Sequence, residues 1–128
     1  MSERSKTKGG ETILLVEDQV EVGDVAEDML DTLGYKVLRA ADANAAIEII
    51  AQHDDIDLML TDIVMPGSMN GADLAHKVME ETGLKAVLVT GYADKAIPSE
   101  QFQQFDVILK PYRMDELEKF IRAALDGS

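Results

Sequence analysis

Short apolar runs alternate along this chain with longer stretches in which apolar residues recur every three or four positions. The runs are bounded by polar residues, which is typical of buried parallel strands. We therefore expect five strands, at residues 13–16, 36–40, 58–61, 86–89 and 107–109. Each strand is followed by a stretch long enough for a crossover helix, so strand and helix alternate five times.

The stretches between the strands carry apolar stripes with helical spacing. Gly34 and Gly83 are expected to end the first and third helices, and Asp42 and Asn70 to cap the second and third at their N-termini. The segment 92–105 contains a proline and few periodic apolar residues, so its helix should be short or unsteady. The four clear stripes are Val22, Val25, Ala26, Met29, Leu30 and Leu33; Ala43, Ala46, Ile47, Ile50 and Ala51; Leu74, Ala75, Val78 and Met79; and Met114, Leu117, Phe120, Ile121, Ala124 and Leu125.

This alternation predicts an α/β fold, with a mainly parallel sheet and helices on both of its faces. Residues 1–11 are polar and lack any periodicity, so we expect a disordered tail. Residues 12–126 are the right length for one domain with one core. The chain stops soon after the last expected helix, and we expect no output domain that binds DNA or catalyses a reaction.

Composition narrows the functional classes. The 25 acidic and 12 basic residues give a net charge of −13, which opposes binding to nucleic acid or to an anionic membrane. There is no cysteine, so disulfides and thiolate metal sites are not available. No apolar stretch approaches the roughly 20 residues of a membrane span, and nothing resembles a signal peptide. We expect a cytoplasmic protein.

Reactive side chains stand where the expected strands end. Glu17 and Asp18 follow the first strand, Asp62 follows the third, and Thr90 and Lys110 follow the fourth and fifth. Each of them alone has an ordinary explanation, such as a solvated loop or a turn. The carboxyl ends of parallel strands share one edge, however, and ligands bind at that edge. The sequence therefore predicts one site that contains all five side chains.

Physical chemistry limits what such a site does. Three carboxylates that lie close together repel one another unless a cation joins them, and Mg²⁺ prefers oxygen ligands. A carboxylate beside Mg²⁺ can accept a phosphoryl group, whose charge is then met by metal, ammonium and hydroxyl groups. Asp62 is the expected nucleophile and Glu17 and Asp18 the expected metal ligands. A backbone carbonyl near Val64 would supply a further metal contact.

The sequence around these residues resembles a known family. The segments LLVED, LTDIVMPG-x₂-NG, VLVTGYA and LKPY are similar to the motifs of response-regulator receiver domains (CheY-like) of two-component signalling. The resemblance covers about residues 12–125. It implies a flavodoxin-like, doubly wound, five-stranded parallel sheet in the order 2-1-3-4-5 with five helices. It also implies Mg²⁺ at the acid cluster and phosphorylation by a histidine kinase.

The resemblance assigns roles to individual positions. Asp62 corresponds to the phosphoacceptor, and Glu17 and Asp18 to metal ligands. Thr90 corresponds to the hydroxyl residue of the phosphorylation switch. Lys110 corresponds to the lysine that pairs with the phosphoryl group, and its bond to the following proline is a cis peptide in many members.

Two positions depart from the family pattern. Glu17 stands where many members have aspartate, which lengthens one metal arm. Val107 stands where most members carry a tyrosine or phenylalanine that rotates during the switch. The TGY after strand four, Phe105-Asp106 before strand five and the KPY after it resemble the "FAT GUY" subgroup. This subgroup consists mostly of single-domain regulators of alphaproteobacteria. Their partners are often histidine kinases of the HWE type. The Phe-Ala of that motif is Leu88-Val89 here.

We therefore expect a phosphoacceptor regulator that signals by docking to a downstream protein or acts as a phosphate sink. The alternative is a receiver domain excised from a hybrid histidine kinase. The only reactions of the expected regulator would be its own phosphoryl uptake and slow dephosphorylation.

Other functional classes would need different residues. A haloacid-dehalogenase-type phosphatase would need a second acid where Val64 stands, and a flavin carrier would need a Ser/Thr-rich loop after strand one. A pseudo-receiver that only binds a partner would not need the acids or Lys110.

Overall fold

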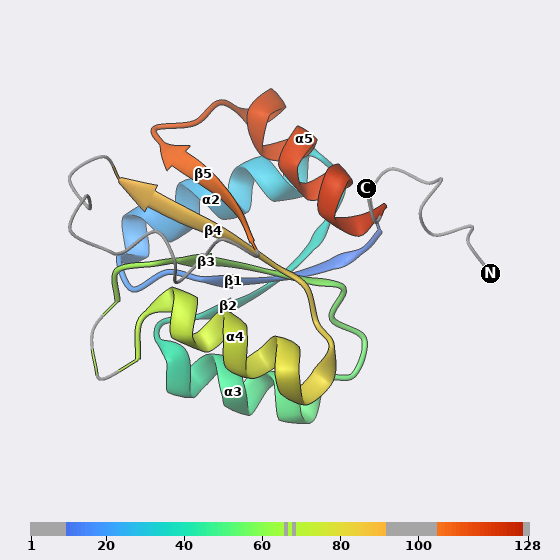
Figure 1. Ribbon diagram of the computed structural model, residues 1–128. Coiled ribbons are helices and arrows are strands. Elements are labelled where there is room, and N and C mark those ends of the chain that lie inside the picture. The colour runs from blue at the N-terminus through green and yellow to red at the C-terminus, as the bar shows by residue number, and fades with distance from the viewer. Residues whose placement is uncertain (1–9, 66, 68, 92–104, 127–128) are drawn as a thin grey trace.

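A single five-stranded parallel sheet forms the centre of the molecule (Figure 1). The computed structural model describes residues 10–65, 67, 69–91 and 105–126. The strand order is β2-β1-β3-β4-β5, which confirms the predicted flavodoxin-like topology. The strands are β1 (Thr12–Val16), β2 (Lys36–Ala40), β3 (Leu58–Asp62), β4 (Ala86–Gly91) and β5 (Asp106–Lys110).

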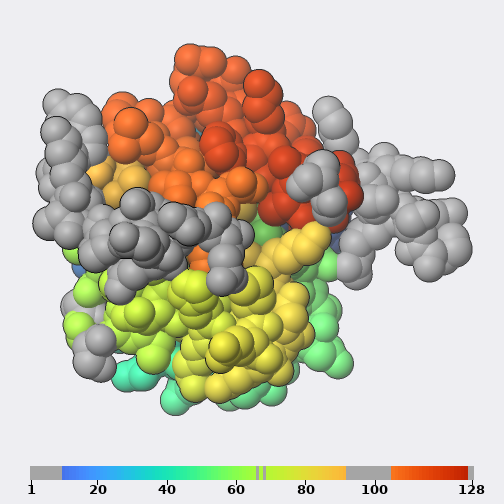
Figure 2. Space-filling model, viewed as in Figure 1, coloured from blue at the N-terminus to red at the C-terminus, as the bar shows by residue number. Residues whose placement is uncertain are grey.

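Helices cover both faces of this sheet. They are α2 (Val20–Thr32), α3 (Ala43–Gln52), α4 (Gly71–Thr82) and α5 (Met114–Leu125). In Figure 1, α2 and α5 lie on one face and α3 and α4 on the other. Figure 2 shows α4, in yellow and yellow-green, below β5 and α5, in orange and red. Among the described residues no helix has the length and apolar character needed to cross a membrane.

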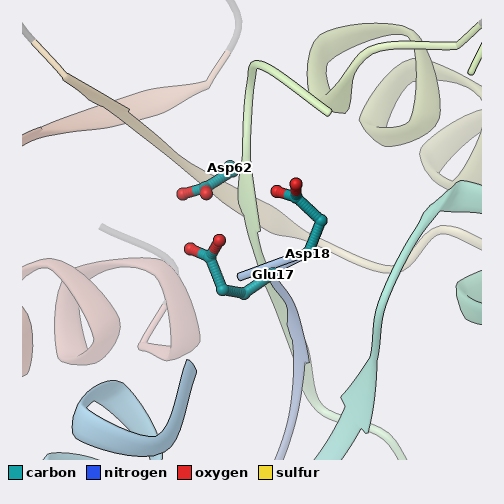
Figure 3. A group of neighbouring side chains, drawn as sticks. All are labelled: Glu17, Asp18 and Asp62. Atoms are coloured by element: carbon teal, nitrogen blue, oxygen red, sulfur yellow. The ribbon is translucent and has the colours of Figure 1, made fainter. Parts of the chain in front are cut away.

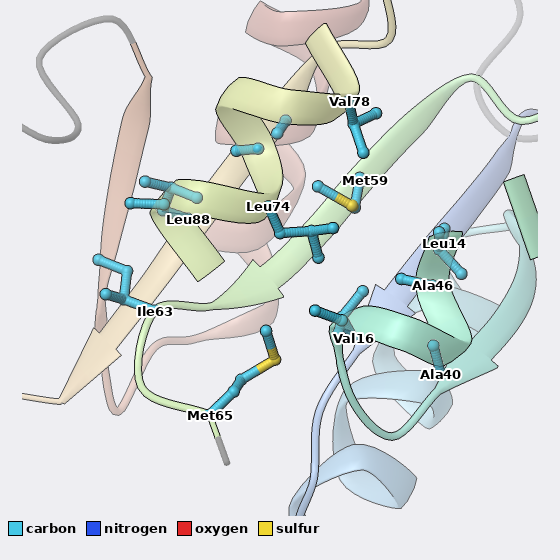
Figure 4. Packing of buried hydrophobic residues seen from close by; sticks show 14 residues of the cluster. Leu14, Val16, Ala40, Ala46, Met59, Ile63, Met65, Leu74, Val78 and Leu88 are labelled. Atoms are coloured by element: carbon cyan, nitrogen blue, oxygen red, sulfur yellow. The ribbon is translucent and has the colours of Figure 1, made fainter. Parts of the chain in front are cut away.

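The layered arrangement divides the core into two clusters. One lies between the sheet and α3 and α4 and includes Leu14, Met59, Leu74 and Leu88, all fully buried (Figure 4). The other lies between the sheet and α2 and α5. Successive strand residues point to opposite faces, so one continuous apolar run supplies both clusters. The central strands β1 and β3 are buried along their whole length, which fixes where their ends lie.

The helix ends follow the predicted capping residues. The Asp42 side chain accepts a hydrogen bond of 2.8 Å from a backbone N–H in the first turn of α3. Asn70 and Asp73 form a reciprocal capping box at the start of α4. Gly34 and Gly83 have φ angles of 98° and 79° after α2 and α4, a conformation that glycine adopts without steric cost. These four predictions are confirmed.

The structure corrects the apolar stripe of α2. Val25 is 57% exposed, although its spacing placed it with the buried residues of the stripe. Periodicity identifies an apolar face but does not show how much of that face the sheet covers. The face of α2 is wider than its contact with the sheet, so Val25 remains on the surface. The expected helix in the segment 92–105 lies outside the described residues except for Phe105.

Two residues of the expected tail at residues 1–11, Gly10 and Glu11, belong to the fold. The Gly10 N–H donates a hydrogen bond of 2.7 Å to the carbonyl of Gly34. The Glu11 side chain is 1% exposed and lies 3.0 Å from the Arg122 guanidinium of α5. Composition places Glu11 in the tail, but its ion partner Arg122 is 111 positions away, so no local pattern reveals the contact. Residues 1–9 lie outside the described residues.

Candidate functional site

Three carboxyl groups meet where the two central strands end (Figure 3). Glu17 and Asp18 follow β1 directly, and Asp62 is the last residue of β3. The strands are hydrogen-bonded neighbours with Val16 opposite Thr61, so their ends coincide. One carboxylate oxygen from each of the three acids lies within 4.8 Å of the others. The predicted convergence of these acids therefore exists in the folded chain.

Lys110 reaches the acids from the edge of the sheet. It is the last residue of β5, which is separated from β3 by β4. Its Nζ atom lies 3.1 Å from Asp62 Oδ1 and 3.5 Å from Glu17 Oε1. The long side chain spans the intervening strand, so that its ammonium group balances part of the negative charge. The following Lys110–Pro111 peptide bond is cis, as the resemblance implied.

The three acids differ in burial. Glu17 and Asp62 are 6% and 9% exposed, whereas Asp18 is exposed. The backbone N–H of Gln19 donates a hydrogen bond of 3.0 Å to Glu17 Oε2, which holds that side chain in place. Glu17 and Asp62 are therefore the buried acids of the site, and Asp18 is the acid exposed to solvent.

Burial and mutual repulsion change the acidity of the buried pair. Burial, together with the neighbouring Glu17 carboxyl group, raises the pKa of Asp62 to about 8. Burial alone would raise the pKa of Glu17, but hydrogen bonds from Asp62 and from the Gln19 N–H lower it. Burial lowers the pKa of Lys110, and the charges of Asp62 and Glu17 raise it by more. In the metal-free site these opposite shifts favour a proton on Asp62 and an ionised Glu17.

This electrostatic balance fits a divalent cation. Lys110 supplies one positive charge to three acids, and burial together with the Glu17 carboxyl group raises the pKa of Asp62 and favours its protonated form. A hard cation would displace that proton and use carboxylate oxygens, which are the ligands that Mg²⁺ prefers. Glu17, Asp18 and Asp62 are the residues that could hold it.

An open pocket of about 420 Å³ is lined by two of the three acids, Asp18 and Asp62, and not by Glu17. The predicted residues Asp18, Asp62, Val64 and Lys110 line this pocket. Val64 is 52% exposed and lies two residues beyond the end of β3. Gln19, Met65, Val89 and Gly91 complete the lining.

Thr90 lies next to the pocket without lining it. It stands at the end of β4, and its hydroxyl donates a hydrogen bond of 3.2 Å to the carbonyl of Gly91. The structure therefore brings the acids and Lys110 together and leaves the Thr90 hydroxyl beside them. Val107 is partly buried on β5 opposite Leu88, where it packs against the cluster under α3 and α4.

Two residues near the site had no role in the sequence analysis. Gln19 holds Glu17 through its backbone, which side-chain chemistry could not indicate. Gly71, the first residue of α4, lies against the main chain of Asp62. The only sequence signal for this contact was the Asn-Gly pair that ends the second motif.

An apolar groove of about 410 Å³ also includes Lys110, which lines the acid pocket. We call it the α2 groove, because Val22, Val25, Ala26 and Met29 of α2 form much of it, with Pro111 and Tyr112 after β5 and with Glu21 and Lys110. The phenol of Tyr112 lies close enough to the site for the charges of Lys110, Asp62 and Glu17 to affect its pKa. Burial raises the pKa of this phenol, and the charge of Lys110 opposes that rise.

Comparison with known proteins identifies the same pattern. A family model described as response regulator receiver domain matches residues 13–122. The uncharacterized transcriptional regulatory protein YrkP of Bacillus subtilis (strain 168) is 30% identical over 115 residues. That alignment covers 88% of this chain and 48% of YrkP, so the chain spans about half the length of this relative.

Two further proteins broaden the comparison. The sensor kinase CckA of Brucella abortus (strain 2308) is 30% identical over 124 residues, which are 92% of this chain and 13% of CckA. The crystal structure of the response regulator protein TrrA from Thermotoga maritima, in complex with Mg(2+)-BeF, has a TM-score of 0.77. It is 24% identical and covers 90% of this chain and 99% of the TrrA chain, which supports the same fold.

Proposed function

Because the chain belongs to the family of response regulator receiver domains, we propose that Asp62 is its phosphoacceptor in a two-component phosphorelay. The family consists of signalling modules, so the reaction would be the uptake and slow loss of one phosphoryl group. The observation that carries the proposal is the pairing of a nearly buried Asp62 with Lys110 beside two further acids. This arrangement supplies a nucleophile and the charges that a phosphoryl group needs.

The proposed step is a direct transfer. A carboxylate oxygen of Asp62 forms a bond to phosphorus, and the bond from phosphorus to a donor histidine nitrogen breaks, with the electron pair left on the imidazole. Asp62 must first lose its proton, since only the carboxylate is nucleophilic. Mg²⁺, held by Glu17, Asp18, Asp62 and the carbonyl of Val64, would favour that loss and would neutralise charge on the phosphoryl oxygens.

Lys110 and Thr90 act on the group after it arrives. The Lys110 ammonium already lies 3.1 Å from Asp62 and would pair with a phosphoryl oxygen. The Thr90 hydroxyl donates to a backbone carbonyl in the unphosphorylated state. It would exchange that acceptor for the phosphoryl group, which is a stronger one because it is charged. This exchange is the proposed start of the response at the end of β4.

The α2 groove supports a protein as the phosphoryl donor. An apolar surface of this kind favours an apolar helix, and Lys110 lines both the groove and the acid pocket. A helix of a histidine kinase that is seated there would bring its phosphohistidine near Asp62. The finer assignments, a kinase of the HWE type and the "FAT GUY" subgroup, rest on the TGY and KPY segments and on Phe105-Asp106.

The output of the phosphorylated state belongs to the same proposal. The chain would act in the cytoplasm, by docking to a downstream protein or as a phosphate sink. The similarity to the sensor kinase CckA favours a second candidate, a receiver that forms part of a hybrid histidine kinase. Efficient phosphotransfer from a separate histidine kinase to this chain in isolation would favour the first candidate over the second, whose donor would be the kinase of which it is a part.

A labelling experiment tests the central claim. The wild type, Asp62→Asn and the control Asp106→Asn are incubated with Mg²⁺ and radiolabelled acetyl phosphate. Asp106 is an exposed acid at the other end of β5. We expect acid-labile label on the wild type and on the control and none on Asp62→Asn. Excess EDTA, or Asp18→Ala, should abolish labelling; full labelling of Asp62→Asn would refute the assignment.

A further inference from the structure

The first residue of α4 lies unusually close to the main chain of Asp62. A Cβ atom on Gly71 would overlap the carbonyl oxygen of Asp62, and it would lie 2.7 Å from the carbonyl carbon of that residue. It would also lie 2.9 Å from the Cα atom of Ile63. Any side chain at position 71 would therefore force the helix and the strand end apart.

The main chain opposite Gly71 has little freedom to move away. The N–H of Gly71 donates a hydrogen bond of 2.7 Å to the carbonyl of Ile63, and the N–H of Ile63 donates one of 2.9 Å to Val89 on β4. The hydroxyl of Thr61, which is fully buried, donates one of 3.0 Å to the carbonyl of Asp62. The end of β3 is thus fixed to β4 on one side and to α4 on the other.

Close approach, and not backbone conformation, explains the glycine at this position. Gly83, at the other end of the same helix, has a φ angle of 79°, and no atom lies within 4 Å of the place that a Cβ atom would occupy there. Gly71 shows the reverse: its φ lies outside the range that favours glycine, and its neighbours leave no space. The close approach of Gly71 is to the main chain of Asp62, whose carboxyl group belongs to the site.

We propose that Gly71 is a positioning residue: its lack of a side chain seats α4 against Asp62 and so sets the place of that carboxyl group between Glu17 and Lys110. The inference rests on the proposed phosphoacceptor role of Asp62. A side chain at position 71 displaces the Asp62 main chain by a distance on the order of 1 Å, and such a displacement of a reacting group costs about 10²-fold in rate. The Mg²⁺ ligands would lose their mutual geometry by the same movement.

The test compares alanine substitutions at the two ends of α4. Gly71→Ala introduces the overlap at Asp62, whereas Gly83→Ala strains the far end of the helix and leaves the site unchanged. Each variant is measured well below its melting temperature for the rate of labelling by acetyl phosphate, and for Mg²⁺ affinity by calorimetry, which needs no turnover. We expect about a 10²-fold slower rate and weaker Mg²⁺ binding for Gly71→Ala, and wild-type values for Gly83→Ala.

Equal values for the two variants would overturn the positioning role. If the wild type itself were not labelled, the proposed phosphoacceptor function would fail, and the Mg²⁺ affinities would still decide whether Gly71 positions the acids. Should Gly71→Ala not fold, the matched pair Asn70→Ala and Asp42→Ala replaces it. Both remove a helix cap whose hydrogen bond is 2.8 Å long, but only Asn70 begins the helix that contacts Asp62. We then expect several-fold slower labelling for Asn70→Ala alone, and equal rates would again overturn the role.

Discussion

The Nζ atom of Lys110 lies 3.1 Å from Oδ1 of Asp62, although 48 residues separate the two in the sequence. The lysine occupies a position from which it would pair with a phosphoryl group, and in the free protein it pairs with the carboxyl group itself. The same Asp62 oxygens are the expected ligands of Mg²⁺. If Asp62 has the proposed function, lysine and metal would compete for it before phosphorylation and cooperate after it.

This competition predicts that Lys110→Met changes two properties in opposite directions. Mg²⁺ binding should tighten, because removal of the ammonium leaves the acids with more uncompensated negative charge. Labelling by acetyl phosphate at saturating Mg²⁺ should slow by about 10²-fold, the usual effect of losing one donor to a developing charge. Calorimetry and labelling rates measure the two effects. Lys77→Met, which removes an exposed ion pair with Glu81, is the control and should change neither.

The raised pKa of Asp62 predicts how the stability of the metal-free protein depends on pH. A group whose pKa is higher in the folded state holds its proton more tightly there, so its contribution is present at low pH and is lost as the pH rises through the folded value. For Asp62 this window runs from the ordinary value of 3.8 to about 8. The free energy of unfolding should therefore decrease between pH 5 and pH 8 in EDTA, by less than the roughly 1.4 kcal/mol per pH unit that one proton allows.

Urea denaturation at several pH values measures this slope. Asp62→Asn should flatten the slope, because the amide resembles the protonated acid at every pH, and the variant should match or exceed the wild type at pH 8. Saturating Mg²⁺ should flatten the slope as well, since the cation replaces the proton. A stability that rises steadily from pH 5 to pH 8 in EDTA, in the wild type and in Asp62→Asn alike, would contradict the raised pKa of Asp62.

The sequence was sufficient for the parts of the fold that repeat simple patterns. Strand ends at Asp62 and Lys110 followed from short apolar runs, and the parallel topology then placed these ends at one edge. The raised pKa of Asp62 could not be predicted, because it depends on how deeply the fold buries this carboxyl group and on how close it brings Glu17. The close contact of Gly71 is likewise a property of how α4 meets β3, and no local pattern encodes it.

Burial of individual positions was harder to predict. Val25 has the spacing of a buried residue and lies on the surface, because periodicity does not show how far a partner layer extends. Glu11 has the composition of a tail and is buried, because its partner Arg122 comes from the last helix. In both cases the deciding information is a contact between segments that are distant in the sequence.

The buried ion pair of Glu11 and Arg122 makes its own prediction. The Glu11 side chain is 1% exposed, and its Oε1 atom has no hydrogen-bond partner among the described residues. The Arg122 guanidinium, 3.0 Å from Oε2, therefore compensates the buried charge of this carboxylate. Arg122→Met should leave an uncompensated buried charge and lower the free energy of unfolding by about 3–5 kcal/mol. The double variant Glu11→Leu/Arg122→Met should recover most of that loss. Urea denaturation measures both, and equal stabilities of the single and double variants would contradict the prediction.

The α2 groove predicts a variant that separates a protein donor from a small one. Val25 is 57% exposed and lines the groove, whereas Val20, 68% exposed at the start of the same helix, does not. Val25→Asn places a polar amide on the apolar surface without altering the charge near Asp62. Phosphotransfer from a histidine kinase that labels the wild type should slow by about tenfold, which corresponds to the ~1.4 kcal/mol of one weakened apolar contact. Labelling by acetyl phosphate should not change, because this small donor does not use the groove.

The control variant Val20→Asn should leave the transfer rates from both donors unchanged. If Val25→Asn slowed both donors equally, the residue would act on the site itself, and the kinase would have to dock elsewhere.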